Sequence, residues 1–412
     1  MTMNDAKQTT ILNKALLYVL LLFVFLIPLY GKILVPLIAI WVILWLMNGS
    51  IKDKISNLKK FPIFLLPVFF YLMHILGMIY TSNFSEGLFD LEIKFSLLLF
   101  PILIIGKKEF FEKNMNSILL AFLIGNCVAA LVCIGYGSFR TIKYDINYFI
   151  YTDFSLFHHT TYASMYALFS IIILIFFLFN KMSISISHKL MAIFLFAILC
   201  AYIYFLSSRT GIIAAILVLG FLTISYCLMK RKWILLISGV IIFMILPYIV
   251  IQNHPRFIPI VNFINTPIDS VKMDAAENIT VRYIIARQSI ELIKQKILLG
   301  TGTGDVKDAL KEQYKQKNIV HALDPVLNSH NQFLETFIGL GILGISSLLL
   351  LVFYPLIVGL KTENVLLITF LLIIISNFMF ESMLNTQAGT IWFSFFYSLL
   401  FQTNAASIVK KQ

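Results

Sequence analysis

The dominant feature of this chain is a series of long apolar segments, which set its fold class before any single residue is considered. Apolar residues do not alternate with polar ones but come in runs of roughly 15 to 25, the length that a helix needs to cross a hydrocarbon layer of about 30 Å. In that layer every backbone amide must find its hydrogen bond within its own segment. The sequence therefore predicts an all-α integral membrane protein.

The apolar runs predict about twelve transmembrane spans. Hydrophobic residues make up 59% of the 412 residues and charged residues only 13%, whereas soluble domains carry about 25% charged residues. Lys7 and Lys14 precede the first run as in a secretory signal, but no small-residue cleavage site follows, so we expect a retained first helix. The expected spans are 12–30, 33–47, 61–80, 92–106, 115–136, 161–179, 189–207, 210–229, 233–251, 331–354, 364–380 and 386–402.

Positive charges are distributed unevenly between the connections of these spans. Every other connection is rich in Lys and Arg, as at 52–60, 107–113 and 230–232, while the opposite short connections hold few. Since short cytoplasmic loops are enriched in these residues, both termini are predicted to be cytoplasmic. The net charge of +12 then reflects topology and attraction to membrane lipids, and no binding of nucleic acid is expected.

One long polar connection falls on the outer, periplasmic side in this topology. It divides the chain into an N-terminal transmembrane bundle (1–251), a periplasmic loop with short helices (252–330) and a C-terminal group of transmembrane helices (331–412). Ionisable groups are costly at membrane depth, and in this chain they gather at the outer ends of helices and in the loop. We therefore expect the chemistry of the protein at the outer membrane boundary.

A short turn between two apolar helices, Ser208-Arg209-Thr210-Gly211, is the first polar stretch on that side. Arginine is costly in a tight hairpin at the lipid boundary. Arg209 either snorkels to the lipid headgroups or presents a fixed cation to an anionic substrate.

The second stretch, Asn278–Gly304, carries isoleucines at roughly helical spacing with Arg282 and Arg287 between them. This pattern predicts an amphipathic helix lying against the outer membrane face. Its ending, Gly300-Thr-Gly-Thr-Gly304, lacks the Gly-Lys-Ser/Thr of a nucleotide-binding loop and is expected to be a plain helix-terminating turn.

The third stretch, Asn328–Glu335, runs directly into an apolar helix. His330 either caps this helix or serves as a base, because imidazole is the side chain best suited to accept a proton near neutral pH. A long loop that returns to the membrane at such a residue is a plausible wall of an active site.

Together these stretches resemble the O-antigen ligase and O-antigen polymerase superfamily, membrane glycosyltransferases that use polyprenyl-diphosphate-linked glycans. The resemblance covers the whole architecture and implies a GT-C-like fold. Ser208–Gly211 matches the family's outer-facing arginine, and His330–Gly344 matches its histidine motif. Arg282–Gly302 matches its stretch of arginine, helix and glycine, although Ala286 stands where the family often has an aromatic residue.

The resemblance implies roles for three of these residues. Arg209 and Arg282 would bind the donor's diphosphate, whose oxygens suit planar guanidinium donors. His330 would be the general base on an acceptor hydroxyl. The implied enzyme is an inverting glycosyltransferase of the bacterial inner membrane that needs neither metal nor ATP. Its donor would be a glycan on undecaprenyl diphosphate and its acceptor a sugar of lipid A–core.

Other polar residues on the outer side are secondary candidates for binding substrate. Ordinary roles at the membrane interface are open for most of them, and Glu335 is also placed to orient a neighbour. These candidates are Arg140, His158, His159, Arg287, Asn331 and Glu335.

Three functions fit this pattern. A ligase would transfer a finished glycan to lipid A–core, and a polymerase would join one lipid-linked repeat unit to another by the same chemistry. A transporter or flippase also has many spans, but such proteins usually place ionisable groups near the bilayer midplane. The polar residues of this chain concentrate at one face, so a transporter is the least favoured of the three. The length of the chain and its compact loop favour the ligase, with the polymerase as the alternative.

Overall fold

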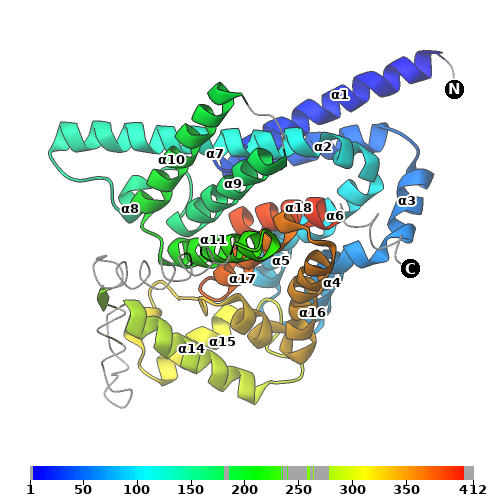
Figure 1. Cartoon of the computed structure of the whole chain (residues 1–412). Coiled ribbons are helices and arrows are strands. Elements are labelled where there is room, and N and C mark those ends of the chain that lie inside the picture. The colour runs from blue at the N-terminus through cyan, green and yellow to red at the C-terminus, as the bar shows by residue number, and fades with distance from the viewer. Residues whose placement is uncertain are drawn as a thin grey trace.

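The computed structural model describes residues 3–180, 185–232, 234, 239, 258–259, 263 and 278–402, and this part of the chain is almost entirely helical (Figure 1). Within these residues the only β-type pairing is an isolated bridge between Leu323 and Val326. The α-helices are α1 Met3–Leu26, α2 Leu34–Met47, α3 Ile51–Lys60, α4 Leu66–Gly77, α5 Phe84–Lys94, α6 Ser96–Gly106, α7 Lys108–Tyr144, α8 Tyr151–Phe154, α9 Thr160–Asn180, α10 Ile186–Leu206, α11 Arg209–Met229, α14 Asn278–Gln295, α15 Val306–Gln316, α16 Gln332–Thr362, α17 Val365–Phe378 and α18 Gln387–Gln402. Short 3-10 helices are η1 Gly31–Ile33, η2 Pro62–Leu65, η3 Met78–Tyr80, η5 Val320–Ala322 and η6 Met383–Asn385.

Six helical segments of the described chain are long and apolar enough to cross a membrane: Pro62–Tyr80, Lys108–Tyr144, Thr160–Phe179, Ile186–Leu206, Arg209–Met229 and Gln332–Thr362. A seventh is added if the bent pair Gly31–Met47 and Ile51–Lys60, which meet at 103°, is one span. Thr10–Leu26 and Val365–Phe378 are shorter apolar helices. The all-α membrane class is thus confirmed. The number of twelve spans stays a prediction, and the expected span 233–251 lies outside the described residues except at 234 and 239.

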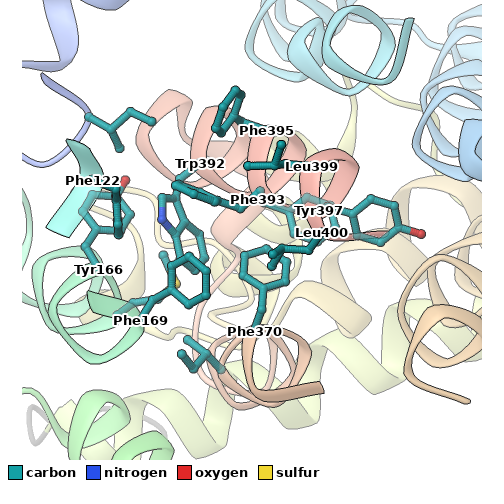
Figure 2. Close-up of a cluster of buried hydrophobic side chains, with 14 of the residues drawn as sticks. Phe122, Tyr166, Phe169, Phe370, Trp392, Phe393, Phe395, Tyr397, Leu399 and Leu400 are labelled. Carbon is teal, nitrogen blue, oxygen red and sulfur yellow. The ribbon is translucent and has the colours of Figure 1, made fainter. Parts of the chain in front are cut away.

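Aromatic side chains form the centre of the helical bundle, around α18. Trp392 of α18 is fully buried, and its ring contacts Tyr166 and Phe169 of α9 and Phe370 of α17. Figure 2 shows these rings closing around the α18 residues from several sides. Packed aromatic rings of this kind bury large apolar areas in specific geometries, which fixes α18 against its neighbours.

The polar loop forms a second, smaller core outside this bundle. Val281, Ile284 and Ile285 of α14 are buried with Tyr314 of α15 and Ile338 of α16. In Figure 1, α14 and α15 lie together at one end of the molecule, beneath α17 and beside α16. The apolar side of the predicted amphipathic helix therefore faces protein. The sequence predicts that side against the outer membrane face, so the structure differs from the prediction here.

The glycine run after α14 does more than end a helix. Thr301 and Gly302 donate backbone hydrogen bonds to Ile338 and Gly339 of α16, at 2.8 and 2.9 Å. Thr303 donates its hydroxyl to the carbonyl of His74 in α4, at 2.7 Å. The run lies between the two helices and ties the outer layer to the bundle, so the plain turn predicted from the sequence is also a docking contact.

Candidate active site

Two of the three expected catalytic side chains converge on one carboxylate that the sequence did not single out. Nη2 of Arg282 lies 3.1 Å from Oε1 of Glu381, and Nδ1 of His330 lies 3.4 Å from Oε2 of the same carboxylate. Glu381 is mostly buried, with 16% of its side chain exposed, while the side chains of Arg282 and His330 are 34% and 22% exposed. A partly open site of this kind leaves the guanidinium of Arg282 and the imidazole of His330 accessible to a substrate.

Each of these side chains is held by the ends of helices. Arg282 lies near the start of α14 and also donates Nη1 to the carbonyl of Phe380, at 3.0 Å. Asn331 caps α16 by accepting from the backbone of Leu334 at 3.0 Å and donates to the carbonyl of Met379 at 3.1 Å. The start of α16 and the segment after α17 are thereby joined beside Glu381. Asn331, which the sequence predicts as a substrate contact, caps α16 and hydrogen-bonds this helix to the segment after α17.

His330 has a left-handed backbone conformation, with φ of 48°. This region costs an L-residue free energy, of order 1–3 kcal/mol, and such residues cluster at functional sites. The backbone N–H of His330 donates to Oδ1 of Asn328 at 3.0 Å, which stabilises the turn. The turn therefore fixes the direction in which the imidazole leaves the chain.

The electrostatics of the cluster favour an ionised Glu381. Burial alone would raise the pKa of this carboxyl group, but its hydrogen bond to His330 and the charge of Arg282 outweigh burial and lower the pKa. An ionised carboxylate only accepts hydrogen bonds, so the proton of a neutral His330 ring is held on Nδ1. Nε2 is then left to accept a proton from a substrate.

Glu335 joins the two segments that carry His330 and Glu381. It is buried, and its Oε2 accepts from the backbone and the hydroxyl of Ser329 at 3.0 and 2.5 Å. Its Oε1 accepts from Nδ2 of Asn385 at 2.8 Å. The expectation that Glu335 orients a neighbour fits this arrangement, because it braces the residue before His330 and the segment after Glu381.

Arg209 lies at the first position of α11 and is half-buried. Ser208 caps this helix by accepting from Gly211 at 3.2 Å. Gly211 packs against Ser164 of α9 so closely that an added Cβ would lie 2.4 Å from its hydroxyl. Tyr162 of α9 accepts a hydrogen bond at 2.8 Å from Thr386, five residues beyond Glu381. These contacts place the start of α11 at the same end of the bundle as Glu381.

The remaining candidates are spread around this end of the molecule. Arg287 is exposed on α14, where its Nε lies 3.9 Å from Glu291. Nε2 of His158 lies 2.9 Å from the carbonyl of Ile27, and burial lowers the pKa of this histidine despite that bond. His159 is exposed at the start of α9, with its ring edge-on to Tyr162. The guanidinium of Arg140 lies 3.7 Å from the ring centre of Tyr148. None of these contacts involves Arg282, His330 or Glu381 within the described chain.

Glu381 is the site residue that sequence reasoning missed. It comes directly after the apolar run 364–380, and a lone acidic residue at the predicted outer end of a span is a sequence signal that could have found it. Among the described residues, no group of three or more His, Cys, Asp or Glu side chains is placed to hold a metal ion.

Membrane-length helices with charged side chains gathered where helices meet define a multi-pass membrane protein with an enzyme-like site. Residues 194–349 match the family model described as O-antigen ligase, and this range contains Arg209, Arg282 and His330. The resemblance to the O-antigen ligase superfamily is thereby confirmed, and the family supports a glycosyltransferase-like enzyme of the ligase or polymerase type. No curated protein matches the chain.

Proposed function

We propose that this protein is an O-antigen ligase that transfers a glycan from undecaprenyl diphosphate to a sugar of lipid A–core at the periplasmic face of the bacterial inner membrane. The observation that carries the proposal is the convergence of Arg282 and His330 on Glu381. Both residues lie within the range that matches the O-antigen ligase family. The proposal includes cytoplasmic termini, an inverting reaction, and no requirement for metal or ATP.

In the proposed reaction a hydroxyl oxygen of the acceptor attacks the anomeric carbon of the donor. The bond from that carbon to the diphosphate oxygen breaks, and its electron pair leaves with the undecaprenyl diphosphate. The hydroxyl proton passes to Nε2 of His330, whose imidazolium is stabilised by Glu381. This dyad resembles other base–carboxylate pairs in which the carboxylate fixes the tautomer and orientation of the imidazole.

Arginine side chains would stabilise the charge that develops on the leaving diphosphate. A guanidinium has five N–H donors, and Arg282 uses two of its nitrogens to bind Phe380 and Glu381. Donors therefore remain for phosphate oxygens without breaking the ion pair. Arg209 is proposed as the second cation, and Arg140, His158, His159, Arg287 and Asn331 remain proposed contacts to donor or acceptor.

Purified full-length protein mixed with undecaprenyl-diphosphate glycan and lipid A–core, without ATP and with EDTA, tests the proposal. We expect a new glycosylated lipid. His330→Ala and Arg282→Ala should abolish transfer without changing the amount of protein in the membrane. Arg287→Ala removes an arginine of the same helix that pairs only with Glu291 in the described chain, so a smaller loss is expected. Normal transfer by His330→Ala would remove this residue from the mechanism.

A deletion strain separates the ligase from the polymerase. Loss of a ligase leaves lipid-linked polymer without an acceptor, so the polymer accumulates. Loss of a polymerase leaves a single repeat unit on the core. The second outcome would replace the proposed acceptor with another lipid-linked glycan and leave the site chemistry unchanged.

A further inference from the structure

A polar cavity of about 280 Å³ lies beside the Arg282–His330–Glu381 cluster and is not part of it. Its walls come from α4, α5, the start of α15, the start of α16 and the segments around Asn328 and Asn385. Pockets for whole drug-sized ligands measure about 300–1,000 Å³. The cavity is therefore large enough for a single small ring and too small for an oligosaccharide.

The cavity is lined by hydrogen-bonding groups that lack partners within the described residues. Nδ1 of His74 lies 3.3 Å from Oδ2 of Asp90, but its Nε2 is buried and unpaired. Glu86 and Lys307 are exposed at the cavity, and neither side chain has a hydrogen bond or ion pair to the described residues. An unsatisfied buried polar atom is costly. A ligand rich in hydroxyl groups, which both donate and accept, would satisfy this mixture of donors and acceptors.

The charge of the cavity differs from that of the neighbouring cluster. Its lining includes the carboxylates of Glu86, Asp90 and Glu335 and the ammonium groups of Lys94 and Lys307. Lys94 is fully buried and paired with Asp90. An excess of carboxylates disfavours an acidic ligand. With three carboxylates against two ammonium groups, this lining suits a neutral or amino sugar better than an acidic ligand.

The cavity shares its wall with the segment that carries His330. Asn328 lines the cavity, and its Oδ1 accepts from the backbone of His330 at 3.0 Å. Glu335 and Asn385 also line the cavity, and Glu335 holds Ser329 through its carboxylate. A ring bound in the cavity would therefore lie against the turn that sets the position of the proposed base.

We propose that this cavity is a subsite for one neutral or amino sugar ring, placed next to His330. Its role in transfer rests on the proposed function, whereas binding of a sugar there does not. Phe89 lies at the cavity with 58% of its surface exposed and offers an apolar face to the C–H groups of a ring. The ring belongs to the acceptor or to the first sugar of the donor.

Saturation-transfer NMR on the full-length protein in detergent tests the binding without any turnover. The probes are methyl β-D-glucoside, methyl β-D-glucosaminide and methyl β-D-glucuronide. We expect signal from the first two, a weaker signal from the glucuronide, and the same result for inactive His330→Ala. Glu86→Gln replaces a charged acceptor with a neutral one, so it should weaken glucoside binding about 3- to 10-fold, within the range of one ordinary hydrogen bond, and reduce the discrimination against glucuronide.

Helix α5 offers matched controls for these variants. Leu88 and Glu92 are exposed on the same helix and are not among the residues that line the cavity. Leu88→Ala should leave binding unchanged where Phe89→Ala weakens it, and Glu92→Gln should leave it unchanged where Glu86→Gln weakens it. Ile93→Trp fills the cavity and should abolish binding, with thermal melting used to verify that it folds. Unchanged glucoside binding in folded Ile93→Trp would overturn the proposal.

Steady-state transfer assays then assign the ring to its source. A rise in KM for lipid A–core alone, in Glu86→Gln and Phe89→Ala, assigns it to the acceptor. A rise in KM for the undecaprenyl-linked glycan alone assigns it to the donor. If wild type transfers nothing, the proposed function fails while the NMR result stands. If wild type transfers and neither KM changes in these variants, the subsite has no part in the reaction and the proposal is overturned.

Discussion

The carboxylate of Glu381 bridges an imidazole and a guanidinium from two distant parts of the chain, 51 residues away for His330 and 99 residues away for Arg282. Each of the three side chains limits the rotation of the other two. Without this carboxylate, His330 loses the group that holds its tautomer, and among the described residues Arg282 keeps only the carbonyl of Phe380 as a partner. Because these contacts share one carboxylate, the three residues are expected to act as a unit.

Glu381→Gln tests this dependence at nearly constant shape. The amide carries no charge and can donate toward His330, which favours the wrong tautomer. We expect kcat for transfer to fall on the order of 10² to 10⁴-fold, the range for loss of an oriented general base. Glu381→Asp keeps the charge at a shorter reach and should retain intermediate activity. A folded Gln variant with wild-type kcat would show that the carboxylate does not orient the base.

The same residue makes a prediction about stability and pH. The pKa of Glu381 in the folded protein lies below its ordinary value of 4.5, so the folded state favours the ionised form relative to the unfolded chain. Its contribution to stability is complete above that ordinary value and is lost as the pH falls through the lowered pKa. The difference in melting temperature between wild type and Glu381→Gln should therefore be larger at pH 7 than at pH 4. An equal difference at both pH values would contradict the ion pair.

At the scale of elements, α16 is interrupted where the outer layer docks. Gly341 has φ of 59° and ψ of −152°, a region that is essentially restricted to glycine. The carbonyl of Leu298 would lie 2.3 Å from an added Cβ. Ile342 donates its N–H to the carbonyl of Ile297 at 2.9 Å. The kink thus exposes backbone groups of α16 to the turn that follows α14.

Gly341→Ala should weaken this contact. A strained backbone and a steric clash together are expected to cost about 3 kcal/mol or more in the free energy of unfolding. Thermal melting in detergent measures the loss. Gly135→Ala on α7 is the matched control, since nothing lies within 4 Å of its added Cβ and alanine favours a helix. Equal melting temperatures for the two variants would show that the kink is not required.

For the whole molecule, the two separate cores raise the question of which side of the membrane the outer layer occupies. The outer layer of α14 and α15 has its own apolar core, separate from the aromatic centre around Trp392. If both termini are cytoplasmic, the layer lies in the periplasm with Arg282, His330 and Glu381 beside it. The charge distribution of the loops makes this prediction independently of the site.

Single cysteines placed on each side test that topology in intact cells. In a variant lacking Cys127, Cys133, Cys200 and Cys227, Lys317→Cys next to α15 should react with a membrane-impermeant thiol reagent. Lys59→Cys on α3 should react only after the inner membrane is opened. Both lysines are exposed in the structure, so accessibility of the protein surface is matched. Labelling of Lys59→Cys in intact cells would reverse the predicted orientation.

Features that depend on neighbouring residues could be predicted from the sequence. Apolar runs of membrane length predicted the helical class, and six helical segments of the described chain are long and apolar enough to cross a membrane. The helix around Arg282 and the start of a helix just after His330 were also predictable, because helix periodicity and helix entries are local patterns of a few residues. Two features could not be predicted: the pairing of Glu381 with both Arg282 and His330, and the cavity beside α5. No local sequence pattern links either of them to the site.

Hydrophobicity by itself decided that this chain folds as helices suited to a membrane, since unpaired backbone groups cannot be left in hydrocarbon. The resemblance of three short stretches to a known family predicted Arg209, Arg282 and His330 as site residues. Only the tertiary structure decided that Arg282 and His330 meet at Glu381, that Glu335 braces the segments on either side, and that a carboxylate-rich cavity lies next to them. Those contacts join residues tens to hundreds of positions apart, and the packing of the helices sets their distances.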